Sequence, residues 1–370
     1  MNKIKILLVS TNADNAGAPI HVRGLIKNLD NNIFECCVVF GSDGPVKHSI
    51  DQMGIKTYLI CGLQSKISPQ KDINSIKLLS EIVKSYKPDI IHAHSTKAGL
   101  LSRIVGYQNK IPVIYTIHGW GWRGLSFFPK IIVYLIEFFS WILFNNTYIC
   151  VAMYVKNQSF ITRNNSKAVV IYNSSPDLLT CKKTEGNNNE IKIVMPARLD
   201  KSKDHITVLK AVNLLPDNIK IFFCGKETNS PYLMDIAKSI LGNNTNRINF
   251  LGDIDDMKQI YSTADILLLS SFFEALPLSL VEGMSLGIPI IASNVGGIPE
   301  LIDDGVNGYL FEVGNVHQLS TLIKKVSDSK LRENLGRNSR KKYLQNHEEK
   351  VMISKVSNLY KSILEIVNVD

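Results

Sequence analysis

Short apolar runs alternate along the first half of the chain with longer segments in which apolar residues recur every three or four positions. The short β-rich runs predict strands, and the three- to four-residue spacing predicts helices. The expected strands are Ile4–Val9, Cys36–Phe40, Lys56–Ile60, Asp89–His92, Val113–Ile117 and Tyr148–Val151. The expected helices include Ile20–Leu29, Asn74–Ser85 and Thr96–Tyr107. This alternation predicts an α/β domain with a doubly wound parallel sheet.

A polar segment, Asn173–Glu190, interrupts the alternation with a proline, a glycine and three consecutive asparagines (Pro176, Gly186 and residues 187–189), which predicts an interdomain linker. The alternation then resumes with strands expected at Ile191–Met195, Ile219–Cys224, Ile248–Leu251, Ile266–Leu269 and Ile288–Ala292, and the chain ends in helical segments from His317 onward. A chain of 370 residues is long enough for two domains that each bury a core. We expect domains at 1–173 and 190–345, a linker at 174–189, and function in the loops that follow the strands.

The segment Leu125–Phe144 departs from this pattern because it is unusually aromatic and carries only Lys130 and Glu137 as charges. It is too interrupted to predict a membrane span. Phe and Trp side chains beside Arg123 and Lys130 suit a helix that lies in a membrane interface. A helix that is hydrophobic all round also suits the core between two sheet elements. The sequence leaves both readings open.

Composition and charge narrow the class of protein. The chain has 45% hydrophobic and 20% charged residues, which is typical of a folded protein without low-complexity bias. Residues 1–173 hold 19 Lys/Arg against 9 Asp/Glu, and the remainder holds 23 against 24. A basic first half suits nucleic acid, an anionic membrane surface or a phosphorylated substrate, but a solvated lysine-rich surface gives the same count. Because the sequence lacks the signatures of nucleic-acid-binding modules, we expect no nucleic-acid partner.

The cysteines and the first residues both indicate a cytoplasmic protein. The six cysteines show no metal-binding spacing and several lie in apolar runs, which predicts reduced, buried thiols: they are Cys36, Cys37, Cys61, Cys150, Cys181 and Cys224. The opening residues have the basic start of a signal peptide, but their apolar stretch is short and ends in Thr11, Asn12 and Asp14 without a cleavage site. They predict a first strand instead.

The strongest local signal follows the expected strand Ile266–Leu269. There the sequence Ser-Ser-Phe-Phe-Glu-Ala-Leu-Pro-Leu-Ser-Leu-Val-Glu-Gly-Met spans residues 270–284 and places Glu274 in a loop and Glu282 in a helix opened by Pro277. The backbone N–H groups at the start of such a helix, at Leu278 and Ser279, can bind a pyrophosphate. The two carboxylates can accept hydrogen bonds from sugar hydroxyls. Taken alone, the pattern is better explained by a turn cap at Glu274 and a solvated helix residue at Glu282.

A second signal follows the expected strand Ile191–Met195. Arg198 and Lys203 lie in the loop Pro-Ala-Arg-Leu-Asp-Lys-Ser-Lys-Asp-His at 196–205, where they can converge on one anion. Arginine offers a planar fork to phosphate oxygens and lysine a compact charge, so the pair could neutralise a diphosphate leaving group. A surface salt-bridge cluster with Asp200 and Asp204 is the alternative.

Together these segments resemble glycosyltransferase family 4. The resemblance rests on Arg-Leu-Asp-x-x-Lys-Asp, on Glu-x-x-Pro-x-x-x-x-Glu, and on Gly-Ile-Pro-Ile-Ile-Ala-Ser-Asn-Val-Gly-Gly-Ile-Pro-Glu at 287–300. It extends to the first domain through Gly17, His94 in His-Ala-His-Ser and His118 in Thr-Ile-His-Gly. Two departures are small: Ala16-Gly17 stands where the family often has paired glycines, and Glu-Ala-Leu-Pro replaces Glu-Gly-x-Pro at 274–277.

The resemblance implies the GT-B fold, with two Rossmann-like domains facing across a cleft. The acceptor would bind the first domain and the nucleotide sugar the second, and the C-terminal helix at 346–370 would pack back on the first domain. Transfer would proceed with retention of anomeric configuration. The family further implies a nucleotide-sugar co-substrate, most often a UDP-sugar, a hexosyl or N-acetylhexosaminyl group, and no separate cofactor.

Family position also implies roles for the site residues. Arg198 and Lys203 would hold the donor diphosphate, Glu274 the sugar hydroxyls and Glu282 the ribose hydroxyls, with Leu278 and Ser279 also in the donor site. His118, with the loop at Gly17, would face the donor from the opposite wall. Fixed positive groups near the departing phosphate stabilise the charge that develops there, which removes the need for a metal. The single Asp-x-Asp, at 253–255, falls where the family has an ordinary loop, so we expect no metal site.

The basic first domain and Leu125–Phe144 together fit a lipid-linked acceptor at the inner face of a bacterial membrane, as in surface polysaccharide, capsule or lipopolysaccharide assembly. The expected location is therefore the cytoplasm, with peripheral contact to the membrane. Two alternatives stay open. A sugar-nucleotide 2-epimerase uses the same fold without an acceptor, and a catalytically inactive protein could bind an anion or a membrane surface.

Overall fold

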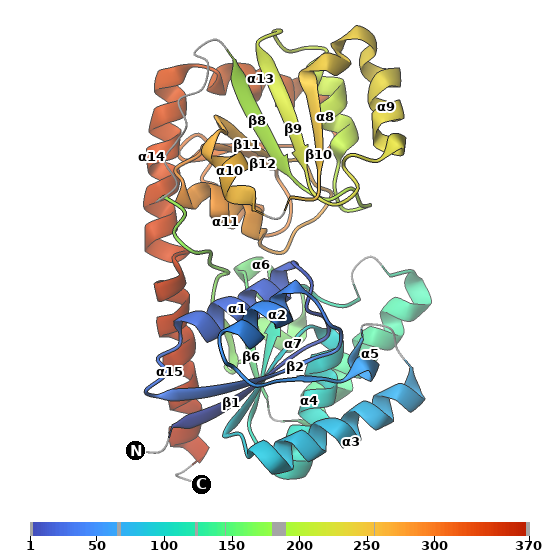
Figure 1. Cartoon of the computed structure of the whole chain (residues 1–370), viewed down its shortest axis with the longest axis vertical. Coiled ribbons are helices and arrows are strands. Elements are labelled where there is room, and N and C mark those ends of the chain that lie inside the picture. Colours follow the sequence, from blue (N-terminus) through green and yellow to red (C-terminus); the bar gives the residue numbers. More distant parts are fainter. Residues whose placement is uncertain are drawn as a thin grey trace. The chain divides into compact units, whose positions relative to one another are not determined.

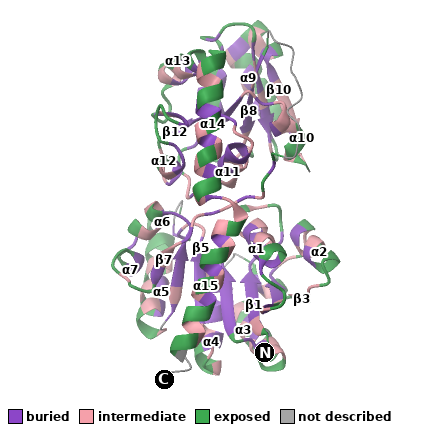
Figure 2. Cartoon of the chain, turned by 90° about the vertical axis from the view of Figure 1, so that its left-hand side faces the viewer, coloured by how far each residue is buried: buried purple, intermediate pink, exposed green. Residues whose placement is uncertain are grey.

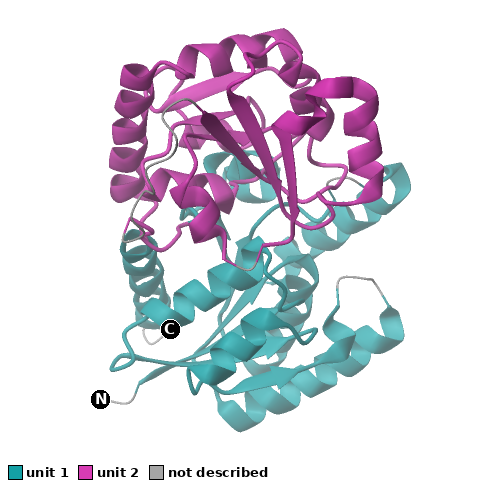
Figure 3. Cartoon of the chain, turned by 45° about the horizontal axis from the view of Figure 1, so that its top comes forward, with its two compact units in different colours: residues 1–173, 349–370 teal, residues 174–348 magenta. Residues whose placement is uncertain are grey.

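The computed structural model describes residues 3–64, 68–122, 125–144, 146–179, 190–254 and 256–367. The chain forms two compact units, one of residues 1–173 and 349–370 and the other of residues 174–348 (Figure 3). Residues 180–189 of the expected linker lie outside the described residues, as do Arg123, Cys181 and Asp255. The last helix of the chain thus belongs to the first unit.

The first unit contains a parallel sheet of seven strands (Figure 1). The strands are β1 (Ile4–Ser10), β2 (Phe34–Phe40), β3 (Thr57–Leu59), β4 (Ile90–His94), β5 (Val113–Ile117), β6 (Thr147–Cys150) and β7 (Ala168–Val170), in the order β3-β2-β1-β4-β5-β6-β7. The helices are α1 (Gly17–Asn28), α2 (Pro45–Gln52), η1 (Cys61–Leu63), α3 (Pro69–Tyr86), α4 (Thr96–Asn109), α5 (Phe127–Leu143), α6 (Met153–Asn157), α7 (Phe160–Arg163) and α15 (Glu349–Val367).

The strands of this sheet bury side chains on both faces, as a doubly wound sheet requires. Ile6 and Leu8 of β1 point into a core completed by α1, α2 and α15. Leu7 and Val9 point to the other face, into a core completed by α3 and α4. Figure 2 shows the strands buried and the helices exposed on their outer sides. The expected first strand is confirmed as β1.

The second unit repeats the arrangement with a parallel sheet of six strands. These are β8 (Ile191–Pro196), β9 (Ile219–Cys224), β10 (Ile248–Gly252), β11 (Ile266–Leu269), β12 (Ile290–Ser293) and β13 (Gly308–Phe311), in the order β10-β9-β8-β11-β12-β13. The helices are α8 (His205–Val212), α9 (Pro231–Leu241), η2 (Gly242–Arg247), α10 (Met257–Ser262), α11 (Leu278–Ser285), α12 (Ile298–Leu301), α13 (Val316–Val326) and α14 (Ser329–Asn346). The predicted pair of doubly wound parallel sheets is therefore confirmed.

Helix α5 covers the segment that the sequence left open, and its orientation excludes a helix buried all round. Its buried residues are Glu137 and Ser140. Many of its large apolar side chains point to solvent, with Phe127 70% and Phe128 76% exposed, whereas Phe138 and Trp141 are half-buried against Phe160. The other exposed ones are Ile131, Ile132, Leu135, Phe139, Ile142 and Leu143. Among the described residues, no helix is long and apolar enough to span a membrane.

The inverted orientation of α5 follows from a buried ion pair. A guanidinium nitrogen of Arg103, on α4, lies 2.8 Å from a carboxylate oxygen of Glu137, and both side chains are 0% exposed. Arg103 also donates to the carbonyl of Gly99 at 3.0 Å. Because a buried cation needs a carboxylate partner, α5 turns its single acid inward, which leaves many of its apolar side chains on the outward face.

The described cysteines differ from expectation at Cys61 and in part at Cys36, which is half-buried. Cys37, Cys150 and Cys224 are buried as predicted, and burial raises the pKa of Cys150 and of Cys224 to about 12. Cys61, in contrast, is exposed because it begins the short η1 turn at the surface.

Candidate active site

The candidate donor site lies where the winding of the second sheet reverses. Strand β8 has β9 on one side and β11 on the other, so the loops after β8 and β11 leave the sheet at its topological switch point. The two loops are joined by backbone hydrogen bonds: Asp204 donates to Ser270 at 3.0 Å and Phe272 donates to Ser202 at 2.8 Å. Lys203 and Ser271 form a bridge between them. The two strongest sequence signals thus meet in one place.

An ion pair between Lys203 and Glu274 lies at the centre of this junction. The Lys203 ammonium contacts Oε1 of Glu274, and each side chain is only 14% exposed. The hydroxyl of Ser271 donates to the same Oε1 at 2.9 Å. Oε2 of Glu274 has no hydrogen-bond partner in the described part of the chain. The carboxylate is therefore held through one of its two oxygens.

Arg198 does not share a protein partner with Lys203, contrary to the simplest form of the expectation. Its Nε contacts the carboxylate of Asp200, and its side chain is 63% exposed. Ser202 donates to Asp200 through its backbone N–H at 2.7 Å. Burial works against the ionised form of Asp200, but the hydrogen bonds from Ser202 and Arg198 hold its pKa below the ordinary value. Part of the alternative reading is thus correct, because Arg198 does pair with Asp200.

The other aspartate of that alternative cluster has a structural role. Asp204 caps α8 by accepting from the backbone N–H of Thr207 at 3.0 Å. The next residue, His205, is buried with its Nε2 3.3 Å from the carbonyl oxygen of Ala197. Burial lowers the pKa of His205 to about 4. A neutral histidine and a helix cap therefore fix the loop that carries Lys203.

Two glycines allow other loops to approach the same junction closely. Gly296 has a φ of +62°, and a Cβ there would lie 1.8 Å from the carbonyl oxygen of Glu274. Gly225 has a φ of +138°, and a Cβ there would lie 2.7 Å from the backbone nitrogen of Arg198. Only glycine tolerates both the conformation and the contact at these positions. The backbone of Gly296 thus packs directly against that of Glu274, and the backbone of Gly225 against that of Arg198.

Helix α11 begins one residue later than predicted. Pro277 is the N-cap, with a ψ of 122°, and the first turn starts at Leu278 and Ser279. Pro277 has no N–H and no side chain caps this helix end. The first-turn N–H groups, which include those of Leu278 and Ser279, point away from the helix at its positive end. This arrangement suits a phosphate, as the sequence predicts.

Glu282 lies inside α11, as expected, and contacts a buried tyrosine. The hydroxyl of Tyr261, from α10, donates to Oε2 of Glu282 at 2.9 Å. Burial, followed by the nearby carboxylate, raises the pKa of Tyr261 well above its ordinary value. Tyr261 therefore stays protonated and orients Glu282, which is itself half-buried.

The candidate residues of the first unit gather around its own switch point, between β1 and β4. Gly17 is the exposed first residue of α1, and His118 follows β5 directly. His94 ends β4, and its Nδ1 lies 3.2 Å from Nε2 of His118. His21, on α1, has its ring centroid 5.0 Å from that of His118. The structure thus surrounds His118, to which family position gives a role in the donor site, with further histidines.

The fourth histidine links this cluster to the last helix. His92 Nδ1 lies 2.6 Å from the hydroxyl of Tyr360 on α15, and its Nε2 lies 2.6 Å from Oγ1 of Thr116. Burial lowers the pKa of His92, His94 and His118 well below 6.5, and that of His21 to about 4. All four rings are therefore neutral near pH 7.

Comparison with known proteins decides the family. Residues 16–174 match the family described as Glycosyltransferase Family 4, and residues 180–342 match the one described as Glycosyl transferases group 1. The chain belongs to glycosyltransferase family 4.

Relatives and solved structures agree with this assignment. The chain is 25% identical over 353 residues to the UDP-Gal:alpha-D-GlcNAc-diphosphoundecaprenol alpha-1,3-galactosyltransferase of Escherichia coli, covering 90% of each chain. It is 21% identical to the capsular polysaccharide biosynthesis glycosyltransferase CapM of Staphylococcus aureus, covering 93% of this chain and 94% of that one. The crystal structure of Anabaena HepE in complex with UDP matches with a TM-score of 0.83 and 20% identity, covering 97% of this chain and all of that one. The fold is therefore GT-B.

Family membership and geometry also identify what sequence reasoning missed. Ser271 and Tyr261 orient the two glutamates, but a serine and a tyrosine in apolar surroundings carry no signal of their own. The contacts of His21 and His92 with the ring of His94 were not predicted, although the spacing of two residues between His92 and His94 predicts that both point to one face of the sheet.

In the described part of the chain, no group of three or more His, Cys, Asp or Glu side chains is placed to hold a metal ion. Asp253 of the Asp-x-Asp follows β10 directly, and Asp255 lies outside the described residues.

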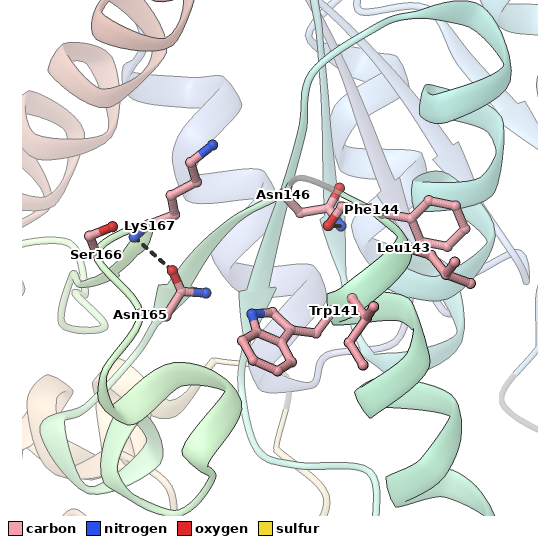
Figure 4. Close-up of a pocket in the computed structure, with 8 residues that line it drawn as sticks. Trp141, Leu143, Phe144, Asn146, Asn165, Ser166 and Lys167 are labelled. Atoms are coloured by element: carbon pink, nitrogen blue, oxygen red, sulfur yellow. Dashed lines mark hydrogen bonds between the residues drawn. The ribbon is translucent and has the colours of Figure 1, made fainter.

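A surface hollow of about 290 Å³ lies away from these candidate residues, at the end of α5 (Figure 4). Trp141, Leu143 and Phe144 reach it from the end of the helix, and Asn165 and Lys167 from the loop before β7. None of the predicted site residues lines it.

Proposed function

We propose that this protein is a retaining glycosyltransferase that moves a hexosyl or N-acetylhexosaminyl group from a UDP-sugar to a lipid-linked sugar acceptor in bacterial surface polysaccharide assembly. Family membership supplies the class of reaction. The Escherichia coli relative is named for a UDP-galactose donor and a diphosphoundecaprenol-linked acceptor, and HepE has been crystallised with UDP and with UDP-glucose. These names support the proposed donor and acceptor.

The observation that carries the donor site is the junction of Lys203, Glu274 and Ser271 at the switch point of the second sheet. A lysine ammonium has three N–H donors, so contact with Glu274 leaves two for oxygens of the diphosphate. The second oxygen of Glu274 accepts from a sugar hydroxyl. The same junction thus contacts the diphosphate and the sugar, the two groups on either side of the bond that breaks.

Further residues complete the proposed donor site. The exposed Arg198 closes on the diphosphate and the first turn of α11, at Leu278 and Ser279, donates backbone N–H groups to it. Glu282 accepts from the ribose hydroxyls. In the first unit, His118 and the start of α1 at Gly17 contact the donor sugar and phosphate.

These groups explain why the reaction needs no metal. Cleavage of the sugar–phosphate bond leaves negative charge on the diphosphate while the sugar becomes positively charged. Fixed cations and helix N–H groups aimed at the departing oxygens stabilise that charge without reorganising. We therefore expect activity to be unaffected by EDTA.

The test is binding and turnover of UDP-, GDP- and ADP-sugars in the presence of EDTA, with and without a lipid-linked sugar acceptor. One donor should bind, and Arg198→Ala and Glu282→Ala should each weaken that binding by about tenfold to a hundredfold. Arg337→Ala, which removes a 69% exposed arginine of α14, is the matched control and should change nothing. Conversion of the sugar nucleotide without an acceptor would identify an epimerase, and binding of no donor at all would refute the transferase.

The proposed membrane contact rests on helix α5. Its exposed side chains Phe128, Ile132, Leu135, Phe139 and Ile142 are spaced by three or four residues and so share one face. A face of this kind, with the exposed Lys130 beside it, suits the headgroup region of an anionic bilayer. The excess of basic residues in 1–173 adds attraction to that surface.

Vesicle sedimentation tests this contact. Phe128→Ser, Ile132→Ser and Phe139→Ser combined should release the protein from vesicles that contain an anionic phospholipid. Met53→Ser, Leu59→Ser and Ile73→Ser combined remove three exposed apolar side chains elsewhere in the first unit and should leave binding intact. Equal binding by both triple variants would refute a role for α5.

A further inference from the structure

Four histidines of the first unit, His21, His92, His94 and His118, form a contact network that the proposed function uses only at His118. His94 is fully buried at the end of β4, and its Nδ1 lies 3.2 Å from Nε2 of His118. At this distance one of the two nitrogens carries a proton and donates a hydrogen bond, which the other nitrogen accepts. The direction of this hydrogen bond decides where the proton of His118 lies.

We propose that His94 is a positioning residue that holds His118 in the tautomer with its proton on Nδ1, so that His118 acts as a neutral hydrogen-bond donor. The inference rests on the proposed function only for the atom that accepts the hydrogen bond from His118. That atom is an oxygen of the sugar or of the phosphate in the nucleotide sugar.

The direction follows from the other nitrogen of His94. Its Nε2 is buried and has no hydrogen-bond partner among the described residues. A proton there would leave an orphaned N–H in the interior, which is rarer in proteins than an unpaired acceptor. The proton of His94 therefore lies on Nδ1 and points at His118. Because a neutral imidazole carries one proton, that of His118 lies on its Nδ1.

The surroundings keep the pair neutral. His21 from α1 and His92 from β4 lie against these rings, and Tyr360 of α15 and Thr116 of β5 bind His92 on its outer side. The neighbours named here include no carboxylate to stabilise a cation. Burial and the adjacent histidines lower the pKa of His94 and of His118 well below 6.5. His118 thus offers an N–H donor without positive charge.

Nδ1 of His118 is the atom free to meet a ligand. The residue is half-buried, and this nitrogen has no hydrogen-bond partner in the described part of the chain. Neutral imidazole in water prefers the tautomer with the proton on Nε2, which would leave Nδ1 as an acceptor only. The contact from His94 reverses this preference before any substrate binds.

Nitrogen NMR of the full chain labelled at histidine, without substrate, reads the tautomer directly, and His118→Gln assigns its signal. We expect the proton of His118 on Nδ1 in the wild type and in His94→Asn, because an asparagine amide can donate from the position of Nδ1. In His94→Leu, which has no donor, the proton should move to Nε2. Turnover of the UDP-sugar should fall about tenfold in kcat/KM for His94→Leu and less than about threefold for His94→Asn.

Two results would overturn the proposal: a proton on Nε2 of His118 in the wild type, or an unchanged tautomer in His94→Leu. Tryptophan fluorescence confirms that each variant is folded, since all three tryptophans lie in the first unit. The NMR measurement needs no substrate. A wild-type protein that shows the expected tautomer but turns over no UDP-sugar would therefore refute the proposed function and leave this inference standing.

Discussion

Removing one partner of the buried pair Arg103–Glu137 should destabilise the first unit far more than removing both. Both side chains are 0% exposed and their nearest charged atoms are 2.8 Å apart. In Glu137→Leu the guanidinium stays buried without its carboxylate, which costs about 3–5 kcal/mol in the free energy of unfolding. In Arg103→Met combined with Glu137→Leu no charge is left behind, so the loss should be below about 1 kcal/mol.

Urea unfolding followed by tryptophan fluorescence measures this difference in the relevant part of the protein. The chain has three tryptophans, Trp120, Trp122 and Trp141, and all lie in the first unit. The signal therefore reports the unit that contains the ion pair and is silent about the second one. Asp43→Ala, which removes a 59% exposed aspartate that contacts His48 in the same unit, controls for loss of a surface pair.

Two outcomes would refute the reasoning. A loss below about 1 kcal/mol for Glu137→Leu would mean that Arg103 finds another partner or reaches solvent. A double variant as unstable as the single one would mean that packing around α5, rather than charge, decides its stability. If the argument holds, the double variant should also keep its vesicle binding, because the apolar face of α5 stays outward.

Three further expectations concern the second unit. Gly296→Ala should lower kcat/KM at least about tenfold because its Cβ would displace Glu274, whereas Gly314→Ala, with a similar φ of +76° but open space around it, should cost only about 1 kcal/mol of stability. Ser271→Ala removes a 2.9 Å hydrogen bond to Glu274 and should lower kcat/KM about fivefold, measured with the same UDP-sugar and acceptor as for the wild type. His205, with its pKa lowered to about 4, binds its proton more readily in the unfolded chain, so stability is full above about pH 6.5 and lost towards pH 4. Calorimetry at about pH 7 and 4.5 should show a loss that is about 2 kcal/mol larger in the wild type than in His205→Leu.

Sequence periodicity predicted the two sheets because most of their strands are continuous apolar runs bounded by polar turns. It missed β7 and β13, which have three and four residues and lie at sheet edges, where short strands carry little pattern. It also missed α2, whose buried residues are only Val46 and Ile50. Burial of an element by its neighbours, not its own sequence, decides such cases.

The candidate site was predicted residue by residue but not contact by contact. Lys203 and Glu274 were both assigned to the donor, yet their ion pair joins residues 71 positions apart and depends on β8 lying beside β11. The orientation of α5 depends in the same way on Arg103, which lies 34 positions from Glu137. The pattern within one segment predicts neither ion pair, because each pair forms only when the sheet and its helices are assembled.

The two cations of the donor site differ in what they can contribute to the proposed reaction. Lys203 is largely buried and held by Glu274, so it is already oriented and little conformational freedom is lost when a diphosphate binds. Arg198 is mostly exposed and, within the described residues, binds only Asp200 of its own loop. It can therefore move onto the ligand, but it loses rotamer freedom in doing so. A fixed lysine stabilises developing charge without reorganisation, which favours the transition state. We therefore expect Lys203→Met to lower kcat and Arg198→Met mainly to raise KM. Kinetics measured over a range of UDP-sugar concentrations would show this difference.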